Sequence, residues 1–486
     1  MGYLDIKFPF FVFITLIFYY LLGMFWQGTL KAKIQQIILL ISSFCFYYLA
    51  VELDCLILFC STIIISFLFA RALANANSER LRKVLLALGI TISCAPLLVV
   101  KIVPWFASAS KLETLIIPLG LSFYTLQIVA YLADCYNKKI SPETNILRYA
   151  LFISFFPQIV QGPIPRYAQL AKQFEEPHDL SPDKFTHGFQ LILWGYFLKY
   201  MIAEKAAIPV NLVFDNYTQY AGFQVLIAAS LYSIQLYTDF YSCVCLCRGV
   251  SLLFGIELMD NFRRPYFSLS MKELWARWHI TLSTWLRDYI YIPLGGSRKG
   301  ATRKYLNILI VFLVSGLWHG NNLCFIVWGI IHAFYQIFEA VTLEIRNEVY
   351  NFLKIDQQTV QVRIFKRIIV FILSTFAWIF FRAGHLDVAF TMLRNMFADF
   401  NPWVLFGKSR FSLGLDVHDV IVLSVSMFAL LIVSTCQELN LPIRRIFCQQ
   451  NIAIRWAVYF FVITAIWIFG AYGYGFNAAD FIYGGF

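Results

Sequence analysis

Long runs of apolar residues recur along most of the chain, and short polar segments separate them. A helix that crosses a bilayer needs about 20 consecutive apolar residues, because each residue adds about 1.5 Å along a hydrocarbon core roughly 30 Å thick. The pattern therefore predicts an all-α, polytopic integral membrane protein with roughly 10–12 transmembrane helices. The runs of sufficient length are residues 8–26, 34–51, 55–74, 84–103, 114–133, 187–208, 222–247, 364–381, 418–435 and 454–471.

Two further apolar segments do not have the length of a single spanning helix. Residues 148–163 are too few to cross, and their Pro and Gly residues predict a re-entrant turn that is buried against protein, since bare backbone is not tolerated in lipid. Residues 307–341 are too many, and the polar sequence at 318–322 interrupts them. This second segment predicts a helical hairpin with the break at its tip.

Composition excludes most soluble classes of protein. Hydrophobic residues make up 60% of the 486 positions and charged residues only 14%, so no soluble core could bury the apolar surface, and a disordered chain is ruled out. No internal repeat is evident, so we expect a single integral membrane domain over residues 1–486. Within it we distinguish N-terminal helices (1–134), a motif-bearing core (135–342) and C-terminal helices (343–486), with re-entrant and interfacial helices among the spans.

The eleven cysteines have neither the loop spacing of a disulfide framework nor that of a metal site. Cys243, Cys245 and Cys247 alternate along one predicted helix, so they point in different directions and cannot share a metal ion. We therefore predict no metal site. The sequence also lacks a P-loop, a dinucleotide-binding glycine motif, a nucleophilic serine elbow and a zinc-type cluster, which argues against an ATP-driven pump and a conventional hydrolase.

Basic residues are concentrated in alternate loops, which indicates the orientation of the chain. The loops after the first, third and fifth predicted spans are basic, whereas Glu52 and Asp54 follow the second, so the N-terminus is predicted to lie outside. The net charge is +11, and the predicted cytoplasmic region 248–305, with ten basic and four acidic residues, supplies more than half of it. Two interpretations of this region stay open: binding of anionic lipid headgroups, and an entrance for a phosphate-bearing donor. Because the charge lies beside the membrane, nucleic acid is not an expected partner.

His319 is the strongest candidate for a functional residue. Both flanks of the 307–341 hairpin are predicted to be cytoplasmic, and the roughly 13 residues between the hairpin end and His319 place the ring about 20 Å into the hydrocarbon core. An ionisable group at that depth is costly, so it is a functional candidate by default. Beside Gly320, Asn321 and Asn322, a neutral imidazole can accept a proton from a hydroxyl group and return it. The alternative is a histidine that only satisfies backbone groups freed by the break.

A second candidate segment, residues 261–303, contains an aromatic stripe at helical spacing. The stripe consists of Trp275, Trp278, Leu282, Trp285 and Tyr289. Such a stripe predicts an amphipathic helix at the membrane interface, with its tryptophans at headgroup level. That interpretation accounts for the tryptophans but not for His279 and Asp288.

Weaker signals come from other ionisable residues within apolar runs. Lys199, Glu204 and Asp239 predict an internal ion-pair network, for which a structural and a functional role are equally open. His332, further along the hairpin than His319, is interpreted as a core histidine with its hydrogen bonds satisfied.

Several motifs occur together in this chain in a combination that resembles one family. They lie at residues 117–125, 155–163, 262–298, 316–320 and 480–483. None of them is specific alone, but together they resemble the membrane-bound O-acyltransferase family. The most similar branch is the bacterial alginate O-acetyltransferase type, with the teichoic-acid D-alanylation protein as a more distant relative.

The resemblance implies a many-helix bundle around a central tunnel across a bacterial plasma (inner) membrane. It also implies that His319 is the indispensable catalytic histidine and that His279 is the second motif histidine. Around these two we predict substrate-binding residues, which are Trp318, Asn321, Asn322, Trp278, Arg277, Asp288 and Arg287. The phosphates of the donor are predicted to bind a basic group formed by Arg298, Lys299, Arg303 and Lys304.

On this basis we expect an O-acyltransferase without a permanently bound cofactor. It would move an acyl group, acetyl in the leading interpretation, from a cytoplasmic acyl-CoA such as acetyl-CoA, or from an acyl carrier protein thioester, to a cell-surface polysaccharide hydroxyl. Transfer would be direct or would pass through an extracellular partner acetyltransferase. The alternatives are D-alanyl transfer toward teichoic acid, a secondary transporter or lipid flippase, and a non-catalytic scaffold for envelope assembly.

Overall fold

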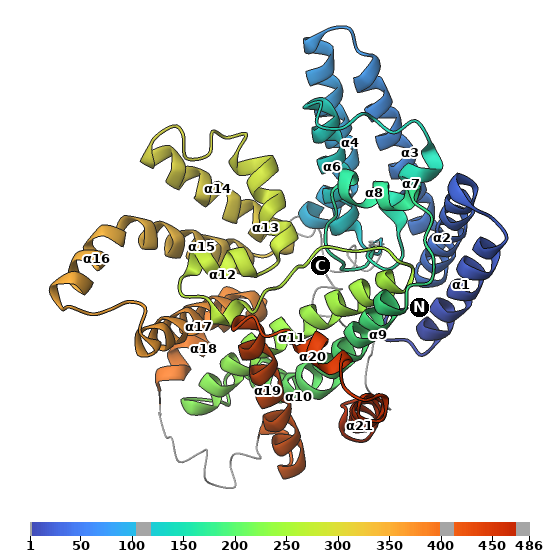
Figure 1. Ribbon diagram of the computed structural model, residues 1–486. Coiled ribbons are helices and arrows are strands. Elements are labelled where there is room, and N and C mark those ends of the chain that lie inside the picture. The colour runs from blue at the N-terminus through green and yellow to red at the C-terminus, as the bar shows by residue number, and fades with distance from the viewer. Residues whose placement is uncertain (1, 104–117, 399–412, 473–486) are drawn as a thin grey trace. The chain divides into compact units, whose positions relative to one another are not determined.

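The computed structural model of the chain describes residues 2–103, 118–398 and 413–472, and all regular structure in these ranges is helical. The predicted all-α membrane fold is confirmed, because eight described helices are long and apolar enough to cross a bilayer (Figure 1). They are α1 (Lys7–Met24), α2 (Gly28–Ala50), α3 (Leu53–Asn75), α4 (Glu79–Ile102), α15 (Leu323–Val341), α17 (Val360–Ala383), α19 (Val417–Glu438) and α21 (Ile452–Phe469).

Three predicted spans take another form. The run at 114–133, whose first four residues lie outside the described ranges, contains α6 (Leu121–Tyr136). That helix begins after Gly120, which has a φ of +72° and whose Cβ, if present, would lie 2.1 Å from the Ile159 carbonyl oxygen. Glycine is therefore required at this start, because only glycine adopts this conformation without strain and without a side chain.

The other two differ in length and regularity. The run at 187–208 is divided among α9 (Pro182–Phe197), a π-helical turn η2 (Leu198–Ala203) and α10 (Glu204–Asp215). The run at 222–247 forms one longer helix, α11 (Phe223–Leu253), of 31 residues. Apolar length predicted the position of these helices but not their ends.

The described residues form two compact units. The first comprises the residues up to Ile192 together with Cys243–Asp260, and the second comprises Leu193–Ser242 together with the residues from Asn261 onward. All the predicted site residues belong to the second unit. The single domain over residues 1–486 and its division at 134 and 342 stay predictions, and the motif at 480–483 lies outside the described residues.

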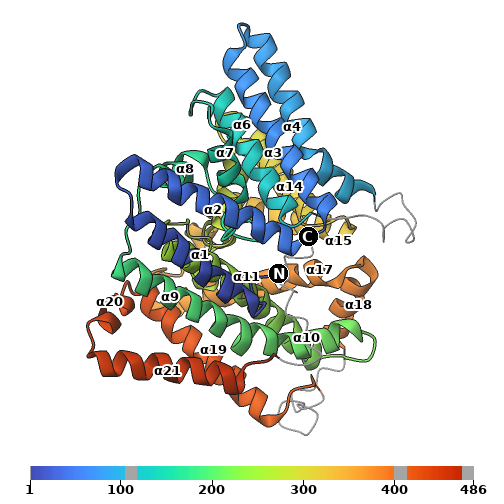
Figure 2. The same cartoon turned by 90° about the vertical axis from the view of Figure 1, so that its right-hand side faces the viewer.

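In the first unit, α1 and α2 lie side by side, as do α3 and α4 (Figures 1 and 2). The segment at 148–163 forms most of α7 (Ile146–Ser154) and then a buried turn that precedes α8 (Tyr167–Glu175). In that turn the N–H of Phe156 donates to Ser43 Oγ at 3.1 Å, and its carbonyl accepts from the Tyr3 hydroxyl at 2.8 Å. The prediction of a short turn buried against protein is confirmed.

Glu143 fixes the loop between α6 and α7 and is 8% exposed. Its carboxylate accepts from the N–H groups of Thr144 and Asn145 at 2.7 and 2.8 Å and from the Tyr167 hydroxyl, and it pairs with Arg148 at 3.4 Å. Burial alone would raise the pKa of Glu143, but these hydrogen bonds and the nearby cation together hold the pKa below its ordinary value.

In the second unit, α14 (Ala301–His319) and α15 form the predicted hairpin, which is confirmed. The two helices pack backbone to backbone through glycines. A Cβ at Gly316 would lie 2.3 Å from the Phe325 carbonyl oxygen, and one at Gly329 would lie 2.5 Å from that of Phe312. The remaining helices of this unit are η3 (Pro265–Phe267), α12 (Met271–Arg277), α13 (Ile280–Leu286), η4 (Arg287–Tyr291), α16 (Leu343–Phe352), α18 (Leu386–Phe397) and α20 (Ile443–Cys448).

The aromatic stripe does not form the single interfacial helix that its spacing predicts. The segment is divided into α12, α13 and the π-helical η4, and the break falls at Trp278 and His279. Trp275, Trp278 and Trp285 are only 8%, 1% and 6% exposed, so their rings pack inside the protein. Periodicity was misleading here because core helices and interfacial helices share the same spacing.

The predicted ion-pair network is confirmed. Lys199, in the π-helical turn η2, is 1% exposed and pairs with Asp239 at 2.6 Å and with Glu204. Partners of this kind are required because an uncompensated buried charge is strongly destabilising.

Candidate functional site

His319 is the last residue of α14 and is 2% exposed. Its ring makes edge contacts with the rings of Trp318, Trp328 and Phe381, at centroid distances of 4.8, 5.2 and 5.2 Å. At the following Gly320 a Cβ would lie 1.9 Å from the Phe325 ring. Only glycine therefore fits at this position, where the helix ends. The structure thus places His319 at the hairpin tip, as the sequence predicts, and surrounds its ring with aromatic side chains.

His279 lies at the break between α12 and α13 in a left-handed conformation, with a φ of +43°. A non-glycine residue adopts this conformation only at a cost, and Asn261 supplies the compensation. The Asn261 Oδ1 accepts from the N–H and the hydroxyl of Thr281 at 3.0 and 2.9 Å, and the Nδ1 of His279 lies 3.3 Å from the same oxygen. Because a carbonyl oxygen only accepts, Nδ1 carries the proton of the neutral ring and Nε2 carries the lone pair.

Trp318 connects the two histidines. Its ring lies 4.8 Å from that of His319 and 6.1 Å from that of His279. The structure therefore brings together the two histidines and one of the predicted substrate-binding residues. Trp278, the neighbour of His279, packs its indole against Trp378 of α17 at 5.0 Å.

A cavity of about 670 Å³ extends along α14 on the face that leads to His319. Lys304, Ile308, Phe312 and Ser315 contribute to its lining, and they recur every three or four residues, which places them on one face of the helix. His319 is the next residue on that face, one turn or about 6 Å further along the axis.

The cavity combines basic and aromatic lining residues. Lys272, Arg287, Lys304 and Arg346 contribute positive charge, and Lys304 lies at the end of α14 opposite His319. Glu339 also lines the cavity, but its carboxylate accepts from two backbone N–H groups at the start of α12, at 2.6 and 3.1 Å. A phosphate-bearing ligand with a long uncharged arm fits this distribution of charge. Its phosphates would bind the basic side chains, and its arm would lie along the apolar face of α14.

The predicted phosphate-binding residues are distributed unequally around this cavity. Lys304 lines it. Arg303 donates from Nε to the Leu294 carbonyl at 3.3 Å, while Arg298 and Lys299 are exposed on the loop that precedes α14.

The predicted substrate-binding residues also occupy several environments. Arg287 lines the cavity and pairs with Asp288 at 2.9 Å. Asn322 is the N-cap of α15, where its Oδ1 accepts from the Phe325 N–H at 3.3 Å. Asn321 is exposed at the hairpin tip.

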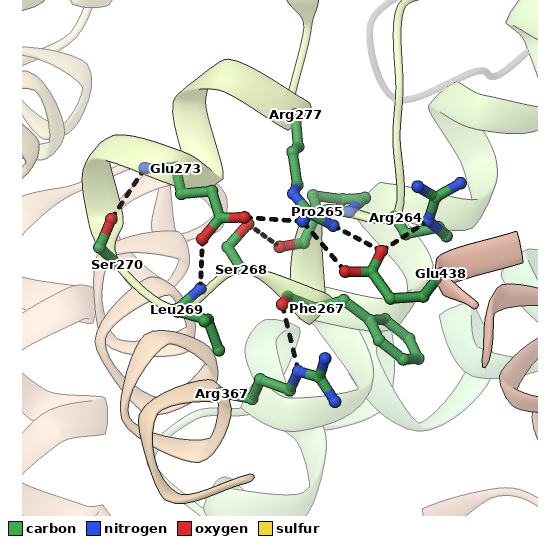
Figure 3. Close-up of polar contacts among 10 residues, drawn as sticks. All are labelled: Arg264, Pro265, Phe267, Ser268, Leu269, Ser270, Glu273, Arg277, Arg367 and Glu438. Carbon is green, nitrogen blue, oxygen red and sulfur yellow. Dashed lines mark hydrogen bonds and ion pairs between the residues drawn. The ribbon is translucent and has the colours of Figure 1, made fainter. Parts of the chain in front are cut away.

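Arg277 lies in a cluster of ion pairs that fixes the start of the α12–α13 segment (Figure 3). Glu438, at the end of α19, accepts from Arg277 at 2.8 and 3.1 Å and from Arg264 Nε at 2.9 Å. Glu273 pairs with Arg277 at 2.6 Å, and Arg367 donates to the Phe267 carbonyl at 3.2 Å. The Arg277 guanidinium is thus engaged by two carboxylates, which ties α12 to α19.

Sequence reasoning assigned no role in this site to three residues that organise it. Asn261 holds His279, Glu438 holds Arg277, and His332 accepts a hydrogen bond from Trp275, a residue of the cavity wall, at 3.2 Å. The position of Asn261 at the start of the 261–303 segment was the one available signal. The interpretation of His332 as a core histidine is confirmed by its burial, but its contact with Trp275 and that of Glu438 with Arg277 join distant segments, for which a single sequence gives no indication.

The comparison with known families decides the classification. The model of MBOAT, the membrane-bound O-acyltransferase family, matches residues 58–382, which include both histidines, α14, α15 and all the residues that line the cavity. The chain belongs to this family. The predicted family resemblance is therefore confirmed.

Individual relatives agree with the family assignment. The chain is 36% identical over 313 residues to the probable alginate O-acetylase AlgI of Pseudomonas syringae pv. tomato, covering 64% of this chain and 58% of the relative. It is 31% identical over 385 residues to the peptidoglycan O-acetyltransferase of Helicobacter pylori, covering 72% of each. It is 28% identical over 262 residues to the teichoic acid D-alanyltransferase of Bacillus subtilis, covering 50% of this chain and 64% of the relative. The match thus spans less than two thirds of the length of the alginate relative.

Proposed function

We propose that this membrane protein is an O-acyltransferase that moves an acyl group, acetyl in the leading interpretation, from a cytoplasmic thioester to a hydroxyl group of a cell-surface polysaccharide. The observation that carries this proposal is the position of His319. It lies one helical turn beyond a basic cavity, on the same face of α14, and shares Trp318 with His279. The named activities of the alginate and peptidoglycan relatives support the same reaction class.

In the proposed reaction His319 acts as a general base. The imidazole takes the proton of the acceptor hydroxyl while the oxygen attacks the thioester carbonyl carbon, so that a C–O bond forms. The C–S bond then breaks, and the proton held by His319 passes to the departing thiolate. The buried aromatic surroundings favour transfer over hydrolysis, because they exclude water from the thioester.

His279 is proposed to act beside His319. Its Nδ1–H is directed at Asn261, which favours the tautomer whose Nε2 carries the lone pair, and this nitrogen is proposed to accept a proton or a hydroxyl group of the substrate. Trp318 and Asn322 are proposed to position the reactants at the hairpin tip.

The donor is proposed to be an acyl-CoA or the pantetheine thioester of an acyl carrier protein. Lys272, Arg287, Lys304 and Arg346 would bind its phosphates, and the apolar face of α14 would guide its arm toward His319. The basic region 248–305 supports a cytoplasmic opening of this cavity, and with it a plasma-membrane location and an N-terminus on the outside. The acceptor side would be served directly or by an extracellular partner acetyltransferase.

The direct test uses the full-length protein in lipid nanodiscs with acetyl-CoA and an acetyl-free polysaccharide fragment. Release of free thiol and gain of acetyl mass on the fragment are measured together. We expect His319→Ala to lose both signals while it retains its thermal unfolding midpoint. The matched control is His385→Ala, which alters an exposed histidine of the same unit and is expected to behave as wild type. Wild-type rates in His319→Ala would reject the mechanism.

A second candidate is D-alanyl transfer toward teichoic acid, which the Bacillus subtilis relative favours. Mass analysis of the group transferred from a charged carrier protein separates it from acetyl transfer, since the two groups differ in mass and in the presence of an amine. A transporter or flippase would instead show substrate counterflow in liposomes without release of free thiol.

A further inference from the structure

The cavity that leads toward His319 ends before it reaches the histidine. Trp275, Phe312 and Ser315 line its inner end, and the Trp275 ring packs on Phe312 at 5.2 Å. Beyond that end, the Trp275 ring contacts Trp328 at 5.7 Å, and Trp328 contacts His319 at 5.2 Å. The two indoles therefore form a continuous wall from the inner end of the cavity to the histidine.

Trp275 is fixed in this wall by one directed contact. Its Nε1–H donates to Nδ1 of His332 at 3.2 Å, and the two rings are perpendicular, with centroids 5.1 Å apart. Because an indole nitrogen only donates, Nδ1 must be the acceptor nitrogen of a neutral imidazole, whose proton is then on Nε2. His332 is 0% exposed, so water does not compete for this hydrogen bond.

The position of His332 is set by the packing of the hairpin. It lies on α15 three residues after Gly329, whose close approach to the Phe312 carbonyl fixes the register of α14 and α15. Its ring also stacks on Phe312 at 5.9 Å and contacts Trp328 at 5.0 Å. His332 thus touches every ring of the wall without lining the cavity itself, which is the arrangement of a positioning residue.

We propose that His332 is a positioning residue that holds the Trp275 indole closed across the route from the donor cavity to His319. The proposal rests on the proposed function, because it concerns how the thioester reaches the catalytic histidine. A donor arm that enters along α14 must displace Trp275, and part of its binding free energy is used to break the hydrogen bond to His332. In the donor-free protein the closed indole keeps the cavity separate from His319, which protects the site from solvent.

Three variants separate this role from general packing. His332→Leu removes the acceptor, and Trp275→Phe removes the donor while it retains an aromatic ring. His332→Asn is the matched control, because the Asn Oδ1 can occupy the position of Nδ1 and accept the same hydrogen bond. We expect the first two to favour the open position by about fivefold, the factor that one neutral hydrogen bond supplies, and the third to resemble wild type.

The first measurement does not require acyl transfer. His319→Cys places a thiol at the catalytic position of the full-length protein, and its rate of modification by a water-soluble maleimide is followed by peptide mass spectrometry. We expect the rate to rise about fivefold when His332→Leu or Trp275→Phe is added, and to stay unchanged with His332→Asn. Equal rates in all four backgrounds, or a His332→Asn rate equal to that of His332→Leu, would overturn the proposal.

The second measurement uses turnover in nanodiscs with acetyl-CoA. We expect His332→Leu and Trp275→Phe to lower the KM for the donor and to raise thiol release without acceptor, each by about fivefold, whereas damage to packing would lower kcat with an unchanged KM. The latter result would reject the role of His332. Absence of thiol release from the wild type would instead reject the proposed function, and the maleimide rates would still decide the closed position of Trp275. If His332→Leu does not fold, Trp275→Phe carries both measurements.

Discussion

Asn261→Ala is the substitution that most directly tests how the site is built. Asn261 is 1% exposed, and its Oδ1 is shared by the N–H of Thr281, the hydroxyl of Thr281 and Nδ1 of His279. Alanine removes this acceptor and leaves the three donors facing a space without a partner. It also removes the contact that offsets the left-handed conformation of His279.

The magnitude follows from the number of donors left unsatisfied. A buried polar group that loses its partner costs about 1–3 kcal/mol, but the Thr281 hydroxyl can rotate toward another acceptor, and the His279 contact is long. We therefore expect a loss of about 3 kcal/mol in the free energy of unfolding. The loss of the hydrogen bond that fixes the His279 tautomer is expected to lower kcat about tenfold, because one such bond corresponds to about 1.4 kcal/mol.

The assay combines the denaturation midpoint of the purified protein with thiol release from acetyl-CoA. Asn347→Ala, at an exposed position on α16, serves as the control and is expected to change neither quantity. Asn261→Asp retains an acceptor oxygen at the same position and is expected to recover most of the stability. An Asn261→Ala protein with wild-type stability and turnover would refute the reasoning that Asn261 holds His279.

Three further perturbations follow from contacts in the structure. Gly329→Ala places a Cβ 2.5 Å from the Phe312 carbonyl oxygen, so it is expected to cost about 1–3 kcal/mol and to lower the thermal midpoint, whereas Gly2→Ala, with open space around it, is neutral. Glu438→Gln removes the charge shared by two arginines, and we expect a loss of about 2 kcal/mol, detected as a lower denaturation midpoint. The pKa of Glu143 is lower in the folded chain than its ordinary value, so its contribution to stability is present at neutral pH and is lost as the pH falls below about 4.3. The thermal midpoint of Glu143→Gln should therefore fall less steeply with decreasing pH in the acid range than that of the wild type.

Local pattern predicted the parts of this fold that depend on local physics. Apolar length located the spanning helices, because the hydrophobic thickness of a bilayer acts on each run independently. The polar break at 318–322 located the hairpin tip and His319, because it interrupts an apolar run that is too long for one span. The tight contact of α14 with α15 was also encoded locally, in Gly316 and Gly329. Only the structure shows, however, that these two glycines fix the register of the two helices.

The parts that were not predicted depend on partners far away in the chain. The break at His279 requires Asn261, the position of Trp275 requires His332 on α15, and the orientation of Arg277 requires Glu438 on α19. Without these partners the spacing of the tryptophans is equally compatible with one continuous helix. The single interfacial helix was therefore the reasonable expectation and was wrong, because hydrogen bonds between distant segments outweighed local periodicity.

The register of the α14–α15 hairpin is the structural feature on which the whole site depends. Consecutive residues of a helix point about 100° apart, so a shift of one residue between the two helices would rotate Trp328 and His332 away from the face that carries Ser315 and His319. A sliding hairpin would thus lose both the wall and the aromatic environment of the histidine. Gly316 and Gly329 prevent such a shift, because each lies against a backbone carbonyl oxygen of the other helix. Sliding one helix along the other would place a residue with a side chain at that close contact. The packing of these glycines explains how residues on two helices are positioned with the precision that the proposed proton transfer requires.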